Sequence, residues 1–347
     1  MVRGQSYPDP LLVFYNFTGP KFQLMKIALT GASGHIGANL CRKLLDNHHD
    51  LRVLTNQYTA SLEGLDLEFV KGDILNMTSL RELANGAEVL IHLAASISIN
   101  GDQHVLDTNV VGTKNVLDVV RSSKVRRLLH FSSIHALVHQ PLDQTLDEER
   151  PLAVSDHIIY NQSKALGEEL VLHAVESGLD AVIINPTSVM GPNDFKPSLI
   201  GQAIIQLFKG KIPALIPGGY DWVDVRDVVE GTIKAMENGR TGQSYLLSGH
   251  FKTLLELYEQ ITLIHGKGKK LPVIPFWLAE VGVPFLKAWA RISRNKPLYT
   301  KESVEILKSA HTKISSKKAR NELGYESRPF IDTLRDTIEW FKENNYL

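Results

Sequence analysis

The sequence predicts an α/β fold, in which a doubly wound parallel sheet carries a smaller C-terminal lobe. Three observations support this prediction. Short apolar runs alternate with segments of helical periodicity over the first half of the chain, as βαβ units require. A glycine-rich turn joins the first apolar run to the first helical segment, and the regular alternation ends near Pro186. We therefore expect an open sheet with helices on both faces and less regular structure after it.

The period of the apolar residues predicts the individual elements. The predicted strands cover residues 26–30, 51–55, 67–70, 88–93, 126–132 and 180–185. The predicted helices cover residues 36–47, 78–84, 102–123, 157–177, 198–210, 226–237 and 331–344. Residues 212–219 are rich in proline and glycine, which predicts a loop.

The first strand is followed directly by the turn Gly31-Ala32-Ser33-Gly34-His35-Ile36-Gly37, and a helical pattern follows the turn. In such a turn the first glycine allows a tight bend, the second lets backbone N–H groups approach a phosphate, and the third lets the helix pack close to the strand. The helix N-terminus adds partial positive charge. Three glycines alone also fit a surface loop, but the flanking strand and helix favour a site for the phosphates of a dinucleotide.

The second strand ends at Thr55-Asn56-Gln57, where such a site usually distinguishes NAD from NADP. An acid here holds the ribose 2′-OH of NAD, whereas an arginine accommodates the 2′-phosphate of NADP. Neither is present, and because no carboxylate would repel the phosphate, the sequence favours NADP over NAD. Arg42 or Arg52 could supply the missing charge, but we expect both on solvated helix or strand faces.

Hydroxyl side chains end the fifth strand, where Ser132 and Ser133 follow the apolar run. Ligands bind at the carboxyl ends of strands in open parallel sheets, so a serine here could donate a hydrogen bond to a substrate oxygen. Serine is also common in strand-end turns, which is the structural alternative.

Tyr160 and Lys164 lie four residues apart in the predicted helix 157–177 and therefore share a face. A phenol ionises near pH 10, and a lysine one turn away favours the phenolate by Coulomb attraction, which suits acid–base catalysis. A surface pair on an amphipathic helix has the same spacing. The glycine turn upstream favours the catalytic interpretation.

Composition restricts the function classes. The chain has 347 residues, is 43% hydrophobic and carries a formal net charge of zero, so it can bury a large core and has no electrostatic preference for nucleic acid or membrane. The single Cys41 cannot form an internal disulfide, which fits a reducing, cytoplasmic compartment. No His, Cys, Asp or Glu cluster has metal-ligand spacing, and we expect His130 and His135 to be core or strand-end residues.

These motifs, in this order, resemble those of the extended short-chain dehydrogenases/reductases, the NAD-dependent epimerase/dehydratase family. Further matching segments are Asp73-Ile74, Leu93-Ala94-Ala95, Asn109-x-x-Gly112-Thr113, Pro186, Gly191-Pro192 and Trp222-Val223-Asp224-Val225-Arg226-Asp227-Val228. The resemblance covers about residues 25–347 and is greatest to the branch of dihydroflavonol 4-reductases and 3β-hydroxysteroid dehydrogenases. It implies a Rossmann-type NAD(P)-binding domain at 25–185 and a mainly substrate-binding lobe at 186–347, with some segments returning to the first domain.

The resemblance also implies residue roles in a hydride transfer between the nicotinamide and a ketone or aldehyde. Tyr160 would donate or accept the proton, Lys164 would lower its pKa and bind the nicotinamide ribose, and Ser133, in preference to Ser132, would orient the substrate oxygen. Asn109 would support the active site from the fourth helix, or only bond neighbouring backbone. The residues implied to contact the cofactor are Gly31, Ser33, Gly34, His35, Ile36, Gly37, Asn56, Asp73, Ile74, Leu93, Ala94, Ala95, Tyr160, Lys164, Pro186, Thr187 and Ser188.

Nucleotide-sugar epimerases and dehydratases of the same family are the main alternative. They typically carry arginines where this chain has Asn185 and Tyr220, and a tyrosine where it has Met190. A diphosphate needs paired cationic donors, so these differences favour a less charged, apolar carbonyl or alcohol substrate. A non-catalytic NAD(P)-binding sensor or scaffold is the second alternative, which the intact Ser, Tyr and Lys set disfavours. The resemblance also suggests a homodimer formed through a four-helix interface.

Two segments lie outside these patterns. Residues 1–24 are expected to be a disordered or non-essential extension, so that a chain starting at Met25 should keep its turnover. Their apolar run is too short to span a membrane, and no small-residue cleavage site follows it. Residues 276–290 are apolar and aromatic, which fits lobe core, a pocket wall or lid, or, least favoured, an interfacial membrane or oligomer contact.

Overall fold

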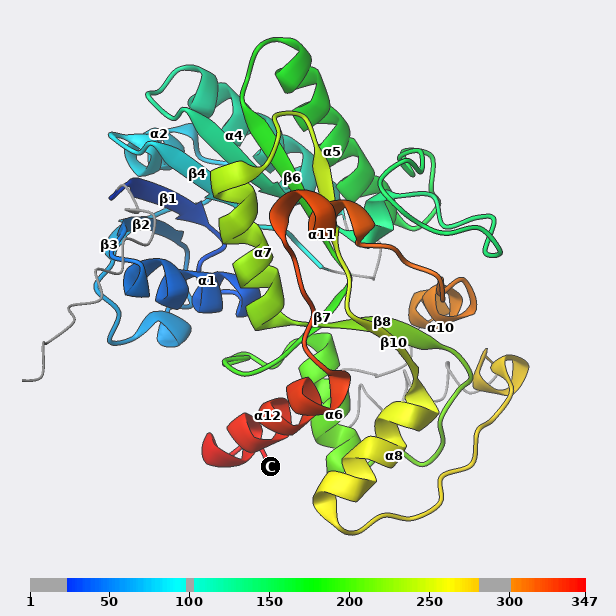
Figure 1. Cartoon of the computed structure of the whole chain (residues 1–347). Helices are drawn as coiled ribbons and strands as arrows, with labels where there is room; N and C mark the ends of the chain where they lie inside the picture. Colours follow the sequence, from blue (N-terminus) through cyan, green and yellow to red (C-terminus); the bar gives the residue numbers. More distant parts are fainter. Residues whose placement is uncertain (1–23, 98–102, 281–300) are drawn as a thin grey trace, which may run out of the picture.

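The computed structural model describes residues 24–97, 103–280 and 301–347 and confirms the doubly wound α/β fold (Figure 1). Seven parallel strands form the large sheet in the order β3-β2-β1-β4-β5-β6-β9. These strands are β1 (Lys26–Thr30), β2 (Asp50–Thr55), β3 (Glu68–Lys71), β4 (Val89–His92), β5 (Arg127–Phe131), β6 (Ala181–Pro186) and β9 (Ser244–Leu247). The strand order reverses between β1 and β4, and ligands of doubly wound sheets bind outside the strand ends at this switch point.

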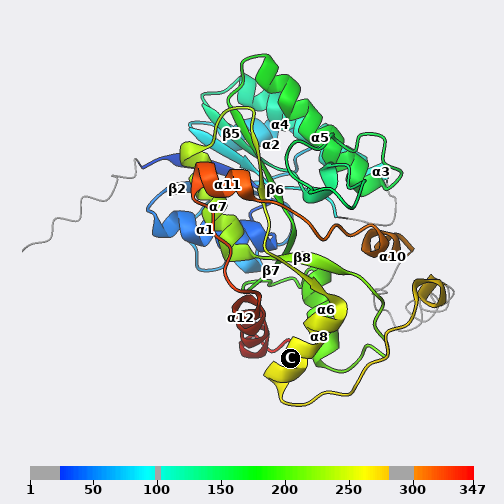
Figure 2. The same ribbon diagram turned by 45° about the vertical axis from the view of Figure 1, so that its right-hand side comes forward.

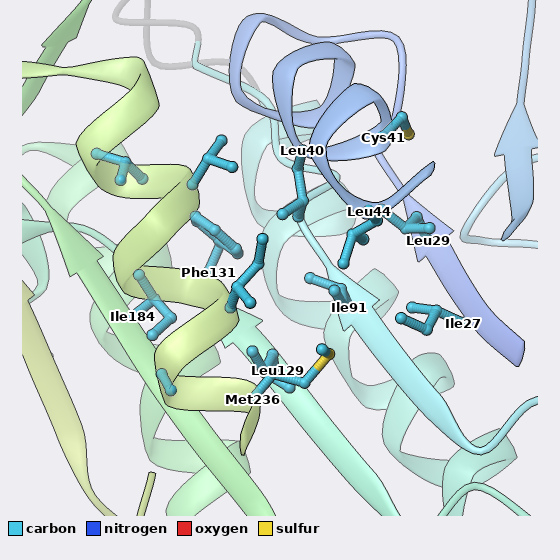
Figure 3. Packing of buried hydrophobic residues seen from close by; sticks show 14 of the residues in the cluster. Ile27, Leu29, Leu40, Cys41, Leu44, Ile91, Leu129, Phe131, Ile184 and Met236 are labelled. Atoms are coloured by element: carbon cyan, nitrogen blue, oxygen red, sulfur yellow. The ribbon is translucent and has the colours of Figure 1, made fainter. Parts of the chain in front are cut away.

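Helices cover both faces of the large sheet (Figure 1). One face carries α1 (His35–Asp46) and α7 (Val225–Asn238), and the other carries α2 (Met77–Ala84), α4 (Gly112–Arg121) and α5 (Ile159–Glu176). Alternation along β1 produces both cores, because Ile27 and Leu29 point toward α1 while Ala28 points to the opposite side. Leu40 and Leu44 of α1 complete the first core at helical spacing (Figure 3).

The predicted helix 102–123 is confirmed from Gln103 to Arg121, although it is not α-helical throughout. The described part consists of α3 (Gln103–Leu106), a π-helical segment η2 (Asp107–Val111) and α4. Asn109 lies in the π-helical segment, and Gly112 begins the α-helix beside Ile74. A Cβ atom on Gly112 would lie 2.5 Å from Ile74 Cδ1, at the end of a flexible side chain that would have to shift. A π-helical turn inside a longer helix leaves the apolar period nearly unchanged, so periodicity does not reveal it.

A second sheet lies beyond β6 and was not predicted. It contains β7 (Ser188–Met190), β8 (Gly219–Asp224) and β10 (His250–Thr253), with β8 in the centre. Around it lie α6 (Leu199–Phe208), α8 (Leu254–His265), α10 (Lys301–Lys308) and α12 (Phe330–Glu343). Figures 1 and 2 show that this small-sheet region, defined by these strands and helices, gathers on one side of the large sheet. The predicted loop 212–219 contributes Leu215 to a bridge with Val273 and the start of β8.

The chain returns from the small-sheet region to the large sheet. After β8, α7 packs against α1, and β9 then pairs with β6. The last such segment is α11 (Lys317–Leu323), which packs beside α7. The predicted helices 198–210, 226–237 and 331–344 correspond to α6, α7 and α12.

Some predictions concern residues outside those that the structure describes. These are the extension 1–24, except for Leu24, and the part of the apolar segment 276–290 that follows residue 280. In the described ranges, no helix combines the length and the apolar character needed to cross a membrane.

Candidate active site

The glycine turn forms a tightly packed cradle at the switch point. Gly31 has a positive φ of 73°, and a Cβ atom there would lie 2.6 Å from the backbone N of Ala94. A Cβ atom on Gly37 would lie 2.3 Å from the carbonyl oxygen of Gly31. Gly34 caps the N-terminus of α1, whose first N–H groups therefore face the turn. This arrangement fits the phosphates of a dinucleotide, because backbone donors can approach an anion without obstruction by side chains.

The residues expected around the adenosine also come together at this end of the sheet. Asn56 Nδ2 donates a hydrogen bond to Asp73 Oδ2 at 3.3 Å, and Asp73 Oδ1 accepts from the backbone N of Leu75. Ile74 is buried beside α4. At the end of β4, the backbone N of Ala94 donates to Thr30 Oγ1 at 3.2 Å. The two strand ends therefore line the two sides of the glycine turn.

Neither arginine lies on the solvated face that the sequence suggested. Arg52 is buried, donates to the carbonyl oxygens of Glu82 and Asn85, and pairs with Glu68 at 2.6 Å. Arg42 donates to the carbonyl oxygens of Ala38 and Ser61, and its guanidinium lies 5.0 Å from the centre of the Phe195 ring. Both guanidinium groups are engaged by carbonyl oxygens of the fold, Arg52 in a buried position and Arg42 in a half-buried one.

A pocket opens beside the glycine turn, and sequence analysis missed most of its lining. It encloses about 530 Å³, part of it open to solvent, and we call it the turn pocket. Its lining residues are Ser33, Gly34, His35, Tyr58, Ser61, Asn193, Phe195 and Lys196. Tyr58 and Ser61 follow β2, whereas the last three residues belong to the loop between β7 and α6. No local motif marks that loop, since only the fold brings it to the turn.

The structure brings Ser133 and Tyr160 together. Ser133 follows β5 and caps the 3-10 helix η3 (Ile134–Ala136), and Tyr160 lies in the first turn of α5. The two side chains form a hydrogen bond, which lowers the pKa of the phenol, but burial has the larger effect and raises that pKa overall. Ser133, rather than Ser132, is thus the serine at the phenol. A phenol with a raised pKa is protonated at neutral pH and can act as a proton donor.

The expectation that Lys164 lowers the pKa of Tyr160 is not met in this arrangement. Lys164 is buried, and its Nζ donates to the carbonyl oxygen of Phe131 at 2.6 Å. Burial lowers the pKa of the lysine to about 8, while the charge of Glu168 acts in the opposite direction. The ammonium group is therefore held at the end of β5, next to the serine strand end, and contributes a buried positive charge there.

Glu168 and Asn185 belong to the same cluster, although the sequence analysis assigned neither a role in the site. Asn185 Nδ2 donates to Glu168 Oε2 at 2.9 Å and to the carbonyl oxygen of Ser133 at 3.1 Å. Both residues are buried. The sequence did contain a sign of the role of Glu168, because this residue lies one helical turn after Lys164 and so shares its helix face. Asn185 thus connects the Glu168 carboxylate to the backbone of Ser133.

Asn109 links three parts of the site. Its Oδ1 accepts from the backbone N of Ser96 at 2.7 Å, and its Nδ2 donates to the carbonyl oxygen of Ser96 and to Ser163 Oγ at 2.9 Å. Ser163 precedes Lys164 on α5. The amide therefore holds the turn after β4 against the helix that carries the tyrosine and the lysine, and its contacts extend well beyond neighbouring backbone.

A second pocket lies beside Ser133 and Tyr160, between the large sheet and α10. Its cavity volume is about 30 Å³, within about 330 Å³ of empty space that includes open solvent, and we call it the histidine pocket. Its lining residues are Ile134, His135, His139, Thr187, Ser188, Tyr220, Asp221, Ile306, Ala310, His311 and Ile314. The rings of His135 and His139 stack at 5.3 Å, and His135 meets the Tyr160 ring edge-on at 6.0 Å. His130 is a core histidine as expected, whereas His135 lines a pocket.

The histidine pocket carries no fixed positive charge. Among the described residues that line it, none is a lysine or an arginine. Burial lowers the pKa of His135 to about 3 and also lowers the pKa values of His139 and His311, so these imidazoles are neutral at pH 7. Asp221 accepts hydrogen bonds from Thr187 Oγ1 and from the backbone N of Gly249, both at 2.7 Å. The pocket therefore offers hydroxyl and imidazole groups between apolar walls.

No metal site accompanies these groups. In the parts of the chain that the structure describes, no three His, Cys, Asp or Glu residues are grouped as metal ligands would be. Cys41 is buried in α1, and burial raises the pKa of its thiol to about 12, so it is a packing residue.

Comparison with known proteins adds independent information. The model of the NAD dependent epimerase/dehydratase family matches residues 27–248. Sterol demethylase protein B of Methylococcus capsulatus is 33% identical over 93% of this chain and 100% of that protein. The Arabidopsis thaliana 3beta-hydroxysteroid-dehydrogenase/decarboxylase isoform 1 is 30% identical over 79% of this chain and 67% of that protein. The crystal structure of gox2253 superposes with a TM-score of 0.81 at 29% identity, covering 94% of this chain and 100% of that one.

Proposed function

Because the chain belongs to the NAD dependent epimerase/dehydratase family and is an oxidoreductase that uses NAD(P), we propose that it reduces a ketone or aldehyde, or oxidises the corresponding alcohol, in the manner of dihydroflavonol 4-reductases. The observation that carries the proposal is the hydrogen bond between Tyr160 and Ser133, next to His135, which lines the histidine pocket and meets the Tyr160 ring edge-on. That pair can bind one substrate oxygen from two sides, as proton transfer to a carbonyl requires.

The glycine turn fits the cofactor, since its backbone donors and the N-terminus of α1 converge where a Cβ atom would not fit. Gly31, Gly34 and Gly37 would hold the phosphates, and Asn56, Asp73 and Ile74 the adenosine. Leu93, Ala94 and Ala95 would lie beside its ribose. Pro186, Thr187 and Ser188 would lie near the nicotinamide. When bound, the nicotinamide supplies or accepts a hydride at the substrate carbon.

The protein residues handle the substrate oxygen and the proton. Ser133 hydrogen-bonds to the carbonyl oxygen and orients it toward Tyr160. Tyr160, which burial keeps protonated, donates its phenolic proton as negative charge develops on that oxygen. The buried ammonium group of Lys164, held at the end of β5 by the carbonyl oxygen of Phe131, would bind the hydroxyl groups of the nicotinamide ribose. In the oxidation direction the same groups accept the proton.

The substrate is an uncharged, largely apolar carbonyl compound. The histidine pocket supplies neutral imidazoles and hydroxyl groups between isoleucine side chains, with no lysine or arginine among its described lining residues. A sugar nucleotide would bring a diphosphate that needs paired cations. Two relatives are named after sterols or steroids, which are apolar compounds of this kind: a sterol demethylase protein and a hydroxysteroid dehydrogenase/decarboxylase.

A carbonyl panel tests this function. NADPH and NADH oxidation, followed by absorbance, should occur with members of a panel of aromatic, aliphatic and steroid ketones and aldehydes. UDP- and dTDP-sugars should give no turnover by product chromatography. Tight cofactor binding with no net oxidation of the panel, together with conversion of a sugar nucleotide, would replace the reductase by an epimerase or dehydratase. Binding without conversion of any compound would favour a sensor.

A further inference from the structure

We propose that Lys196 binds the 2′-phosphate of NADP and thereby makes the protein prefer NADP to NAD. The inference rests on the proposed function, because it assumes that the glycine turn binds a nicotinamide dinucleotide. It answers a question that the end of β2 leaves open, since Thr55 and Asn56 supply neither the acid typical of NAD sites nor the arginine typical of NADP sites.

The turn pocket joins the glycine turn to the segment after β2. Ser33, Gly34 and His35 form one wall, and Tyr58 and Ser61 form another. Ser61 Oγ donates to the carbonyl oxygen of Ser33 at 2.9 Å, which fixes the two walls relative to each other. In doubly wound sheets the adenosine ribose lies between the first turn and the end of the second strand. The turn pocket therefore occupies the side on which a ribose 2′-substituent emerges.

Lys196 reaches this pocket from a loop that is anchored on α1. The carbonyl oxygen of Pro192 accepts from Asn39 Nδ2 at 3.2 Å and lies 3.0 Å from His35 Nε2. Asn193 Nδ2 donates to Asn39 Oδ1 at 2.9 Å. Phe195 in turn carries the guanidinium of Arg42 over its ring. These contacts fix the backbone next to Lys196, so its ammonium group has a defined approach to the pocket.

Lys196 can pair with an anion in the turn pocket, whereas Arg42 and Arg52 already bind other groups of the protein. Its Nζ lies 5.6 Å from the centre of the Tyr58 ring, and its side chain is exposed. None of the described carboxylates forms an ion pair with it, whereas Arg42 and Arg52 are both occupied by backbone acceptors. No carboxylate is found among the described residues that line the pocket. An anion at this place would meet the ammonium group of Lys196, while the carboxylates that act on Tyr58, those of Asp194 and Glu63, lie outside the pocket lining.

The 2′-phosphate fits this cation better than the pyrophosphate does. The pyrophosphate is already served by the backbone of the glycine turn and by the N-terminus of α1. The Tyr58 ring, over which Lys196 lies, belongs to the segment after β2 on the ribose side. A 2′-phosphate carries up to two negative charges and strong acceptor oxygens, and a lysine can serve it as a point charge.

Direct binding of the full chain tests the assignment without relying on turnover. Dissociation constants for NADPH and NADH are measured by nicotinamide fluorescence for the wild type and for Lys196→Gln. We expect Lys196→Gln to weaken NADPH binding by roughly tenfold or more, as the loss of a charge-assisted contact implies, and to change NADH binding by less than about twofold. Lys196→Arg should restore NADPH binding. Lys209→Gln, at the exposed end of α6, should change neither constant.

Competition with adenosine 2′,5′-bisphosphate and with AMP completes the test. The bisphosphate should lose affinity for Lys196→Gln, while AMP should not. Equal weakening of NADPH and NADH, or no effect on either, would overturn the role at the 2′-phosphate. Failure of the wild type to bind either dinucleotide would instead refute the proposed function, so the two failures are distinguishable.

Discussion

At the scale of single residues, the site is defined by buried polar groups that hold one another in place. Burial raises the pKa of Tyr160 above its ordinary value near 10, so the phenol stays protonated at neutral pH, and the hydrogen bond with Ser133 opposes the rise. Lys164 carries a positive charge in a region that also contains the neutral histidines His92 and His130, whose pKa values burial lowers. Glu168 is the carboxylate that favours the charged lysine.

Removal of the Glu168 charge should shift the pH dependence of turnover. Burial lowers the pKa of Lys164 to about 8 and Glu168 opposes this, so turnover that needs the ammonium falls as the pH rises through that value. In Glu168→Gln the pKa of Lys164 falls further, and the alkaline decline of kcat moves to lower pH. The new amide oxygen can still accept from Asn185, so the fold should be retained. The measurement is kcat against pH.

The controls for this shift are Glu168→Asp, which retains the charge, and Glu169→Gln, which removes the neighbouring carboxylate. Both should decline at about the wild-type pH. An unchanged alkaline limb in a folded Glu168→Gln protein would show that the Glu168 charge does not act on Lys164.

At the scale of elements, the sequence motifs identified the residues of the site, but they did not reveal how the helices and strands pack against one another. The turn between β1 and α1 could be predicted because each of its glycines has a separate steric reason, and the helix with Tyr160 and Lys164 could be predicted from its period. The π-helical segment around Asn109 could not, since a π-helical turn leaves the apolar period nearly unchanged. The lining of the turn pocket comes from two segments that lie far apart in the sequence.

The third glycine of the turn should be the least tolerant of substitution. A Cβ atom in Gly37→Ala would lie 2.3 Å from the carbonyl oxygen of Gly31, so α1 must move away from β1. We expect a loss of stability of roughly 2 kcal/mol or more and loss of dinucleotide binding. Gly64→Ala is the control, because it has open space and only a positive φ, at a cost of about 1 kcal/mol. Equal stability of the two variants in urea would contradict the close packing of the turn.

At the scale of the molecule, two hydrophobic cores are joined by the junction of β8 and α7. One core lies between the large sheet and the α1 and α7 helices, and another fills the small-sheet region. Asp224 caps α7 and pairs with Arg226 at 2.7 Å, while Asp227 pairs with Arg328 at 2.7 Å. Both carboxylates are buried. Arg328 immediately precedes the segment that leads into α12, so this ion cluster ties the last helix to the centre of the chain.

We expect Arg328, at this junction, to contribute more to the free energy of unfolding than the exposed Arg335. Arg328→Met should lower the free energy of unfolding by roughly 3 kcal/mol, because it removes the partner of a buried carboxylate. Arg335→Met removes an exposed pair with Asp332 and should cost less than about 1 kcal/mol. Urea unfolding measures both values. A loss for Arg328→Met no larger than that for Arg335→Met would show that the cluster does not stabilise the junction.

The sequence could predict the large sheet because its strands are continuous apolar runs and its helices are amphipathic. It could not predict β7, β8 and β10, which are short and whose residues are polar in part, nor the return of β9 to the edge of the sheet beside β6. Periodicity describes neighbours along the chain, whereas these strands are stabilised by partners distant in sequence. For the same reason the histidine pocket, lined from η3, β8 and α10, was not foreseen.

The central claim is that Tyr160 is the proton donor of a hydride-transfer enzyme, and one variant tests it most directly. Tyr160→Phe removes the phenolic oxygen and leaves the glycine turn untouched. The account predicts that turnover of the best carbonyl substrate falls by a factor of about 10² or more, while the dissociation constants of NADPH and NADH stay close to the wild-type values. A Tyr160→Phe protein that binds the cofactor and still turns over at the wild-type rate would contradict it.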